Sequence, residues 1–194
     1  MKDWIGNSRS AHATLGARNY ANEDRQEHDY YATHPSAAHG LLALGLGIRN
    51  VWEPACGEGH LAKVFDEVGI LGKATDLYDR GYGEADMDFL LEDNKWGGWI
   101  VTNPPYKFAR QFCEQAIRLA EDGVAMFLKL QFLEGKERKR FFMKTPPSTV
   151  YVYSSRQRCA MNGDFVKYAK SNAVAYAWYI WLPDFHGAPE IKWI

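Results

Sequence analysis

The sequence predicts an α/β fold in which a mostly parallel sheet carries helices on both faces. Short apolar segments rich in β-branched residues alternate with segments whose apolar residues recur at helical spacing. A strand, a crossover helix and a further strand in regular succession produce parallel neighbours. A glycine-bearing loop joins the first strand to its helix, as is typical of sheets that bind ligands at the carboxyl ends of their strands.

The elements can be placed from these patterns in order along the chain. Strands are expected at residues 49–53, 73–77, 99–102, 124–130, 149–153 and 173–181, with a shorter one around residues 85–88. Helices are expected from His34-Pro35-Ser36, where proline suits a first turn, and over residues 60–68, 108–120 and 134–142. The last two strands have no helix between them, so we expect them to form one antiparallel edge hairpin.

Size and composition favour one domain in an intracellular setting. Residues 30–194 are enough for a single core, and residues 1–29 read as a polar arm. The arm lacks the apolar centre of a signal peptide, and no apolar run is long enough to cross a membrane, so a cytoplasmic location is expected. Cys56, Cys113 and Cys159 lie far apart, which argues against a disulfide framework and against a metal site.

The tetrapeptide Asn103-Pro104-Pro105-Tyr106 is the most informative motif of the chain. It follows the apolar strand at residues 99–102, so it is expected at a strand end. Asn103 offers a side-chain carbonyl oxygen and Pro104 a backbone carbonyl, and both can accept hydrogen bonds from an exocyclic amine. Tyr106 offers an aromatic face for a flat substrate. Alone, the motif is equally consistent with a stiff turn, and the loop upstream decides between these interpretations.

That loop runs from Glu53 to His60 and fits two classes of ligand. Gly57, Gly59 and Ala62 match the dinucleotide pattern, and Asp76 at the end of the second strand can hold ribose hydroxyls in either case. Glu53 adds negative charge where pyrophosphate would lie, which disfavours a dinucleotide. The same charge suits S-adenosylmethionine, which has an ammonium and a sulfonium group and no phosphate.

The loop followed by the tetrapeptide resembles amino-group DNA methyltransferases that use S-adenosylmethionine, and it is most similar to small phage-type adenine enzymes with gamma-like motif order. Tyr31-Ala32-Thr33-His34-Pro35 is similar to that family's N-terminal cofactor motif, with His34 inserted before the proline. Asp88-Phe89 resembles the acidic motif beside the adenine of the cofactor. The resemblance implies a class I, Rossmann-like methyltransferase fold and these cofactor-binding residues: Tyr31, Thr33, Glu53, Pro54, Ala55, Cys56, Gly57, Gly59, Asp76, Leu77, Asp88, Phe89 and Asn103.

The resemblance further implies a site-specific methyl transfer to the N6 amine of adenine in DNA. The base is expected to rotate out of its helix, to stack on Tyr106 and to donate to Asn103 and the Pro104 carbonyl. Neither a metal nor a covalent intermediate is required. A short basic stretch is expected to contact nucleic-acid phosphates, with these residues involved: Lys136, Arg138, Lys139, Arg140, Arg156 and Arg158.

Several alternatives stay open at this stage. RNA adenine, cytosine N4 and protein glutamine are acceptors that share the tetrapeptide. A non-catalytic module that binds cofactor or nucleic acid is the alternative from a different class. The chain has no room for a separate target-recognition domain, so target choice falls to the loop at residues 156–171 or to a partner protein.

Overall fold

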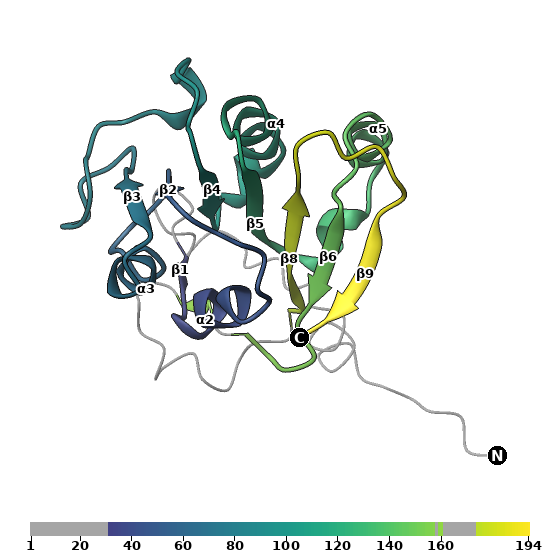
Figure 1. Ribbon diagram of the computed structural model, residues 1–194, viewed down its shortest axis with the longest axis horizontal. Coiled ribbons are helices and arrows are strands. Elements are labelled where there is room, and N and C mark those ends of the chain that lie inside the picture. Colours follow the sequence, from purple (N-terminus) through teal and green to yellow (C-terminus); the bar gives the residue numbers. More distant parts are fainter. Residues whose placement is uncertain (1–30, 158, 161–173) are drawn as a thin grey trace, which may run out of the picture.

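A computed structural model describes residues 31–157, 159–160 and 174–194 (Figure 1). The expected arm at residues 1–29, Arg158 and most of the loop at 156–171 lie outside these ranges. The strands are β1 (Ala32–Thr33), β2 (Val51–Glu53), β3 (Leu71–Ala74), β4 (Trp99–Thr102), β5 (Gly123–Lys129), β6 (Thr149–Val152), β7 (Cys159–Ala160), β8 (Tyr176–Trp181) and β9 (Glu190–Trp193). The α-helices are α2 (Ser36–Leu42), α3 (Ala62–Glu67), α4 (Ala109–Leu119) and α5 (Lys136–Lys144).

A seven-stranded sheet with the order β3-β2-β4-β5-β8-β6-β9 forms the centre of the molecule. β3, β2, β4 and β5 are parallel, so their carboxyl ends meet at one edge of the sheet. β8 runs antiparallel to both β5 and β6, which confirms the expected antiparallel pairing of the last two predicted strands. β8 is inserted between β5 and β6, and the outer position belongs to β9, which pairs parallel with β6.

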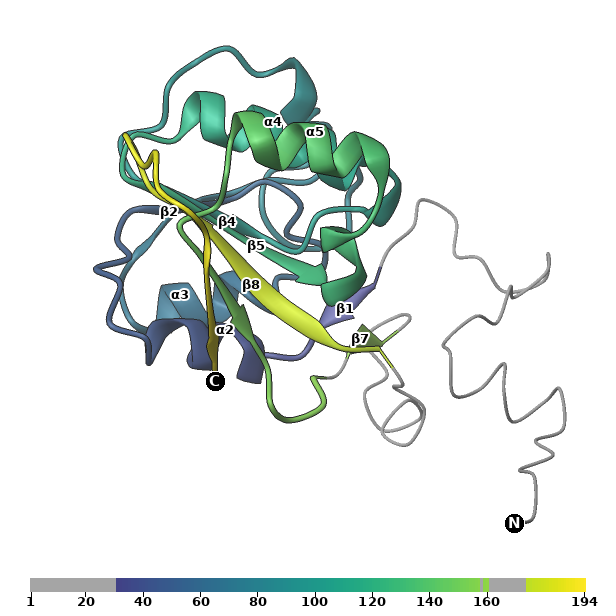
Figure 2. The same ribbon diagram turned by 90° about the vertical axis from the view of Figure 1, so that its right-hand side faces the viewer.

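Helices cover both faces of the sheet, as the sequence predicts (Figures 1 and 2). Successive strand residues point to opposite faces, so Ile100 joins the core under α4 and α5 while Val101 joins the core under α2 and α3. The two cores are filled largely by aromatic side chains, among them Phe112 and Tyr179 on one face and Phe65 and Trp178 on the other. Within the described ranges, every helix is too short or too polar to span a bilayer.

Three strands were not expected from the sequence, and one expected strand is replaced by a turn. β1 and β7 are two-residue strands that pair with each other, and β9 is exposed along its whole length. None of the three therefore has the apolar pattern from which a strand is predicted. Around residues 85–88 only an isolated bridge forms, between Glu84 and Thr75. Asp86 has a φ of 57° and Gly83 a φ of 73°, and these left-handed conformations break an extended segment.

Candidate active site

The candidate site lies at the carboxyl edge of the parallel strands. The segments that follow β2, β3, β4 and β5 meet there because the four strands run in the same direction. They bring together the glycine loop, Asp76, the Asn103–Tyr106 tetrapeptide and the turn after Lys129. Two residues of the N-terminal motif join them, namely Thr33 of the short strand β1 and Tyr31, which immediately precedes that strand.

Asn103 lies at the end of β4 with a fixed amide orientation. Its Nδ2 donates to the Tyr31 carbonyl at 3.1 Å and to Thr33 Oγ1 at 2.8 Å. A backbone carbonyl can only accept, so the Nδ2 atom must face Tyr31 and the Oδ1 atom must point away. Oδ1 is buried and has no hydrogen-bond partner among the described residues. A buried acceptor in this state is suited to an incoming donor.

Tyr106 is held by contacts on its hydroxyl and its ring. The hydroxyl lies 2.9 Å from that of Tyr176, and the ring stacks on Tyr31 with centroids 5.4 Å apart at an interplanar angle of 27°. Lys129 Nζ lies 3.9 Å from the ring centre. Burial raises the pKa of the Tyr106 phenol well above its usual value, so the group stays neutral. Tyr31 and Lys129 therefore lie against the Tyr106 ring, on which the substrate is expected to stack.

The two prolines set the path of the chain out of β4. Pro104 is buried, and the Pro105 carbonyl accepts from the Phe108 amide at 2.9 Å. That hydrogen bond closes a single 3₁₀ turn at Tyr106–Phe108, which leads directly into α4. Both Asn103 and Tyr106 are thereby placed at the sheet edge by backbone with little freedom.

Asp76 anchors the glycine loop. Its Oδ2 accepts from the Gly57 amide at 2.8 Å and its Oδ1 accepts from the Tyr78 amide at 3.0 Å. Each carboxylate oxygen can accept a further hydrogen bond, so the expected ribose contact is compatible with these bonds. Gly59 has a φ of 79°, and a Cβ there would lie 2.5 Å from the ring of Tyr82. The loop therefore requires glycine for its conformation and for this close approach.

Glu53 is a buried carboxyl group at the end of β2. Its side chain is 2% exposed, and Oε2 has no hydrogen-bond partner among the described residues. Burial raises the pKa of Glu53 well above its usual value, although the Ala62 amide hydrogen bond opposes this. A buried carboxylate without a cation is costly, and a bound ammonium group would relieve that cost.

The other expected cofactor residues divide between the loop and the core. Pro54 is buried, Ala55 packs against the core under α4, and Leu77 is 45% exposed. Cys56 is buried, which raises its pKa to about 12 and keeps the thiol neutral. Phe89 is also buried and meets Trp52 edge to face at 5.3 Å.

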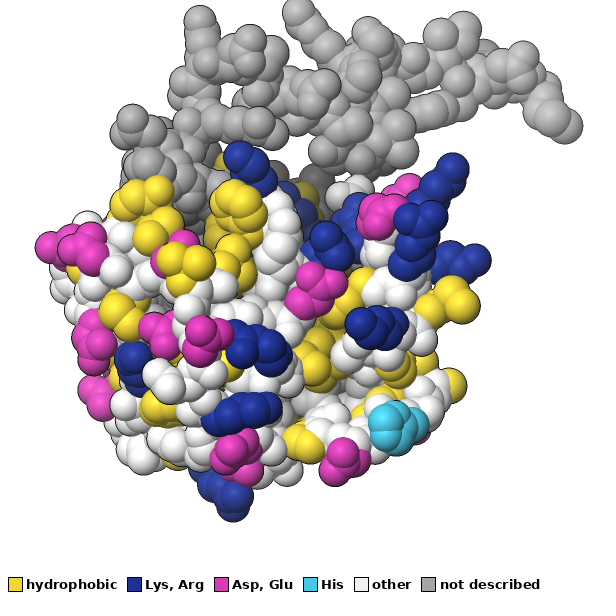
Figure 3. Space-filling view, turned by 90° about the horizontal axis from the view of Figure 1, so that it is seen from above, with side chains coloured by type: hydrophobic (Ala, Val, Ile, Leu, Met, Phe, Trp, Pro, Cys, Tyr) yellow, Lys and Arg dark blue, Asp and Glu magenta, His cyan; other side chains and the backbone are white. Residues whose placement is uncertain are grey.

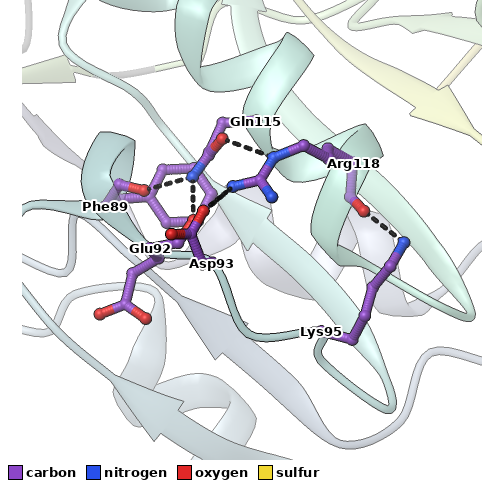
Figure 4. Close-up of polar contacts among 6 residues, drawn as sticks. All are labelled: Phe89, Glu92, Asp93, Lys95, Gln115 and Arg118. Atoms are coloured by element: carbon purple, nitrogen blue, oxygen red, sulfur yellow. Dashed lines mark hydrogen bonds and ion pairs between the residues drawn. The ribbon is translucent and has the colours of Figure 1, made fainter.

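The segment that contains Asp88 and Phe89 is hydrogen-bonded to α4. Asp88 Oδ1 accepts from the Leu90 amide at 2.9 Å and caps a short 3₁₀ helix. Gln115 donates to the carbonyls of Phe89 and Glu92, and Arg118 pairs with Asp93 (Figure 4). The Phe89 ring is buried in the core, so a ligand can contact only the backbone of this residue.

The predicted basic residues follow α5 and the adjoining turn. Lys136, Lys139 and Arg140 are exposed, as is Arg156, whereas Arg138 is half-buried. The Arg138 guanidinium lies 5.4 Å from the Phe132 ring centre and donates to the Gln131 carbonyl at 3.3 Å. Figure 3 shows Lys and Arg side chains over this part of the molecule, with acidic side chains among them. Arg158 lies outside the described residues.

A cleft of about 310 Å³ opens between Tyr106 and α5. Most of the residues that line this cleft have no role predicted from the sequence, because they come from separate elements, among them β5, the following turn and α5, and form no local motif. The sequence does show a charged residue, Lys129, at the end of the apolar strand β5. The lining residues are Tyr106, Ala109, Leu128, Lys129, Gln131, Phe132, Glu134 and Arg138. Among the residues that the structure describes, no group of His, Cys, Asp and Glu is placed to hold a metal ion.

Neither a family model nor a curated protein matches the sequence, but the fold matches solved structures. A candidate RNA methyltransferase from Pyrococcus horikoshii aligns over 90% of this chain and 97% of its own, with a TM-score of 0.56 and 14% identity. A dimethyladenosine transferase from Plasmodium falciparum aligns over 80% of this chain and 63% of its own, with a TM-score of 0.53 and 14% identity. A protein from Lactococcus lactis described as a candidate hemolysin aligns over 84% of this chain and 92% of its own, with a TM-score of 0.53 and 12% identity. At these identities the likeness concerns the fold, and it confirms that the chain has the Rossmann-like fold of class I methyltransferases.

Proposed function

We propose that the chain transfers a methyl group from S-adenosylmethionine to the exocyclic amine of a nucleic-acid base. The observation that carries this proposal is the Oδ1 atom of Asn103. It is a buried acceptor of fixed orientation, and no described residue donates to it. An exocyclic amine is a donor that fits it, and Tyr106 follows three residues later at the same edge of the sheet.

The residues around the glycine loop fit S-adenosylmethionine. The unpartnered Oε2 atom of Glu53 suits the ammonium group. Asp76 is close enough to raise the pKa of Glu53 further, so a cationic cofactor matches the charge of these two carboxyl groups. Gly57 and Gly59 allow close approach of the backbone, and Asp76 keeps acceptor capacity for ribose hydroxyls. When bound, the cofactor supplies an electrophilic methyl carbon.

The chain's own part in the transfer is to position the amine and to stabilise charge. Asn103 Oδ1 and the Pro104 carbonyl accept from the amine, and this leaves its lone pair directed away from them. Positive charge that develops on the nitrogen is stabilised by the same two acceptors. The fixed Asn103 amide means that little reorganisation is needed, so positioning supplies most of the rate gain.

Adenine N6 in DNA is the acceptor that we propose first, because the order and spacing of the motifs resemble DNA adenine enzymes. RNA adenine is the second candidate, since the names of two fold neighbours refer to RNA or to dimethyladenosine. The exposed cations Lys136, Lys139 and Arg140 on α5 support a polyanionic substrate in either case.

An acceptor panel tests the proposal. The protein is incubated with S-adenosylmethionine that bears a labelled methyl group, together with duplex DNA, single-stranded DNA or bulk RNA. The nucleic acid is then digested to nucleosides for mass spectrometry. We expect labelled N6-methyldeoxyadenosine, whereas label in RNA would assign the same chemistry to an RNA enzyme. Confirmed cofactor binding without transfer to any nucleic acid would contradict the proposal.

A further inference from the structure

The short strands β1 and β7 form a two-stranded ribbon beside the site, separate from the main sheet. They pair antiparallel, and the register places Thr33 directly opposite Cys159. Segments that lie far apart in the sequence therefore meet next to Asn103. Ribbons of this length are weak on their own, so side-chain contacts must contribute to holding this one in place.

Thr33 is the first of the two residues that connect the ribbon to the site. Its side chain is buried, with 4% exposed, and Oγ1 accepts from Asn103 Nδ2 at 2.8 Å. Across the ribbon, Thr33 is paired with Cys159. The Thr33 hydroxyl is thus an acceptor for Asn103, and the ribbon fixes the backbone that carries this hydroxyl.

Cys159 is the second. Cys159 is partly buried and packs against the core cluster that contains Tyr176. Burial raises the pKa of the thiol to about 11, so it remains neutral near pH 7. The Tyr106 and Tyr176 hydroxyls are themselves 2.9 Å apart. Cys159 therefore packs against the same core as Tyr106 while it pairs with Thr33 across the ribbon.

We propose that Thr33 is a positioning residue that holds the Asn103 amide, and that Cys159, its partner across the ribbon, holds Thr33 in place. The inference rests on the proposed function and deepens it. The terminal torsion of an asparagine side chain is broad, so an unsupported amide would sample many directions for Oδ1. The Tyr31 carbonyl fixes which end of the Asn103 amide faces it. The Thr33 hydroxyl restricts the rotation of this amide about its terminal torsion. A functional group held within about 0.5 Å and 10–20° keeps its productive geometry.

Thr33 has a different role in this proposal from the one that the resemblance implies. The resemblance implies cofactor binding, whereas in the structure the Thr33 hydroxyl accepts from Asn103 Nδ2. A cofactor role predicts that loss of the hydroxyl weakens cofactor binding. A positioning role predicts that cofactor binding persists and that turnover falls. The two roles therefore differ in which kinetic constant responds.

Thr33→Val removes the hydroxyl and keeps the branched shape, and Thr33→Ser keeps the hydroxyl and serves as the matched control. We expect the valine variant to lower kcat about 10- to 100-fold, as small misplacements of reacting groups do. Cofactor Kd and acceptor KM are expected to stay within about twofold, and serine to restore most of kcat. Unchanged kcat, or a cofactor Kd that rises in place of a fall in kcat, would overturn the proposal.

Cys159→Ala tests the junction, with Cys159→Ser as its control. If the two residues act as a unit, the Thr33→Val, Cys159→Ala double variant loses about as much kcat as either single variant. If the losses in kcat of the two single variants multiply in the double variant, Thr33 and Cys159 do not act as a unit and the proposal is overturned. A readout without catalysis separates this proposal from the proposed function. The Asn103 side-chain amide protons, identified by their absence in Asn103→Ala, are expected to exchange slowly in the wild type and quickly in Thr33→Val. Equal exchange rates would overturn the positioning role even if methyl transfer is confirmed.

Discussion

Glu53 shows most clearly how one residue links stability to the proposed ligand. Its buried carboxyl has a raised pKa, so the folded protein binds a proton that the unfolded chain releases above pH 4.5. The stability of the cofactor-free protein is therefore expected to fall as pH rises from 4.5 through the raised pKa. Under the proposed function, a bound ammonium group would offset the cost of burying this carboxyl group.

Replacing Glu53 with Gln is expected to stabilise the cofactor-free protein at about pH 8 by roughly 1–3 kcal/mol and to flatten the dependence of stability on pH. Urea unfolding at about pH 5 and pH 8 measures both effects. Glu67→Gln, at an exposed position on α3, is the matched control and is expected to change neither. A wild-type slope that survives in Glu53→Gln would show that another group titrates.

Asp76 is a structural residue whatever the ligand. Replacement by Ala leaves the Gly57 and Tyr78 amides without their acceptor. Hydrogen bonds to a charged group are each worth about 1.5–3 kcal/mol, so we expect a loss of about 2–4 kcal/mol after relaxation of the loop. Urea unfolding without cofactor checks this. A loss below about 0.5 kcal/mol, the range of ordinary surface substitutions, would mean that the loop does not depend on Asp76.

At the scale of elements, the sequence predicts what is locally encoded. β4 and β5 are continuous apolar runs, and such runs identify buried parallel strands without further information. β1 and β7 are two residues long and exist only because distant segments meet, so no local pattern predicts them. The same reason explains the site: the tetrapeptide was placed correctly at a strand end, whereas the contacts of Asn103 with Tyr31 and Thr33 depend on long-range folding.

The prediction for nucleic-acid binding concerns the basic residues of helix α5. Lys139 is exposed on this helix, so we expect it to contribute through phosphate charge and with little sequence preference. Lys139→Gln is expected to reduce the slope of log K against log salt concentration by about 1. Lys192→Gln on β9 at the far edge of the sheet is the control and should leave the slope unchanged. Equal slopes for both variants would place the nucleic acid elsewhere.

At the scale of the whole molecule, two candidate binding regions lie on opposite sides of β4. The glycine loop, Glu53 and Asp76 lie beside β2 and β3, while the cleft lined by Lys129 and Phe132 lies beside β5 and α5. Asn103 and Tyr106 follow β4, the strand between β2 and β5 in the sheet. A cofactor on one side and an acceptor on the other would meet at these two residues.

Ligand binding at the first of these regions is expected to stabilise the whole fold. A ligand present at about 100 times its Kd raises the free energy of unfolding by about 2.7 kcal/mol. Thermal unfolding with S-adenosylmethionine should show this rise, and NAD at the same concentration should produce none, because Glu53 disfavours a pyrophosphate. Stabilisation by NAD alone would support the dinucleotide interpretation that the loop pattern also fits.

The most direct test of the central claim is single-turnover methyl transfer by the wild type and by Asn103→Ala, with cofactor Kd measured for both. Asn94→Ala, at an exposed loop position, is the matched control. We predict that Asn103→Ala loses at least about 100-fold in transfer rate, as expected for removal of a preorganised hydrogen-bonding group. Its cofactor Kd is expected to stay within about threefold of the wild-type value. Transfer at the wild-type rate by Asn103→Ala would contradict the assignment of the buried Asn103 oxygen as the acceptor for the substrate amine.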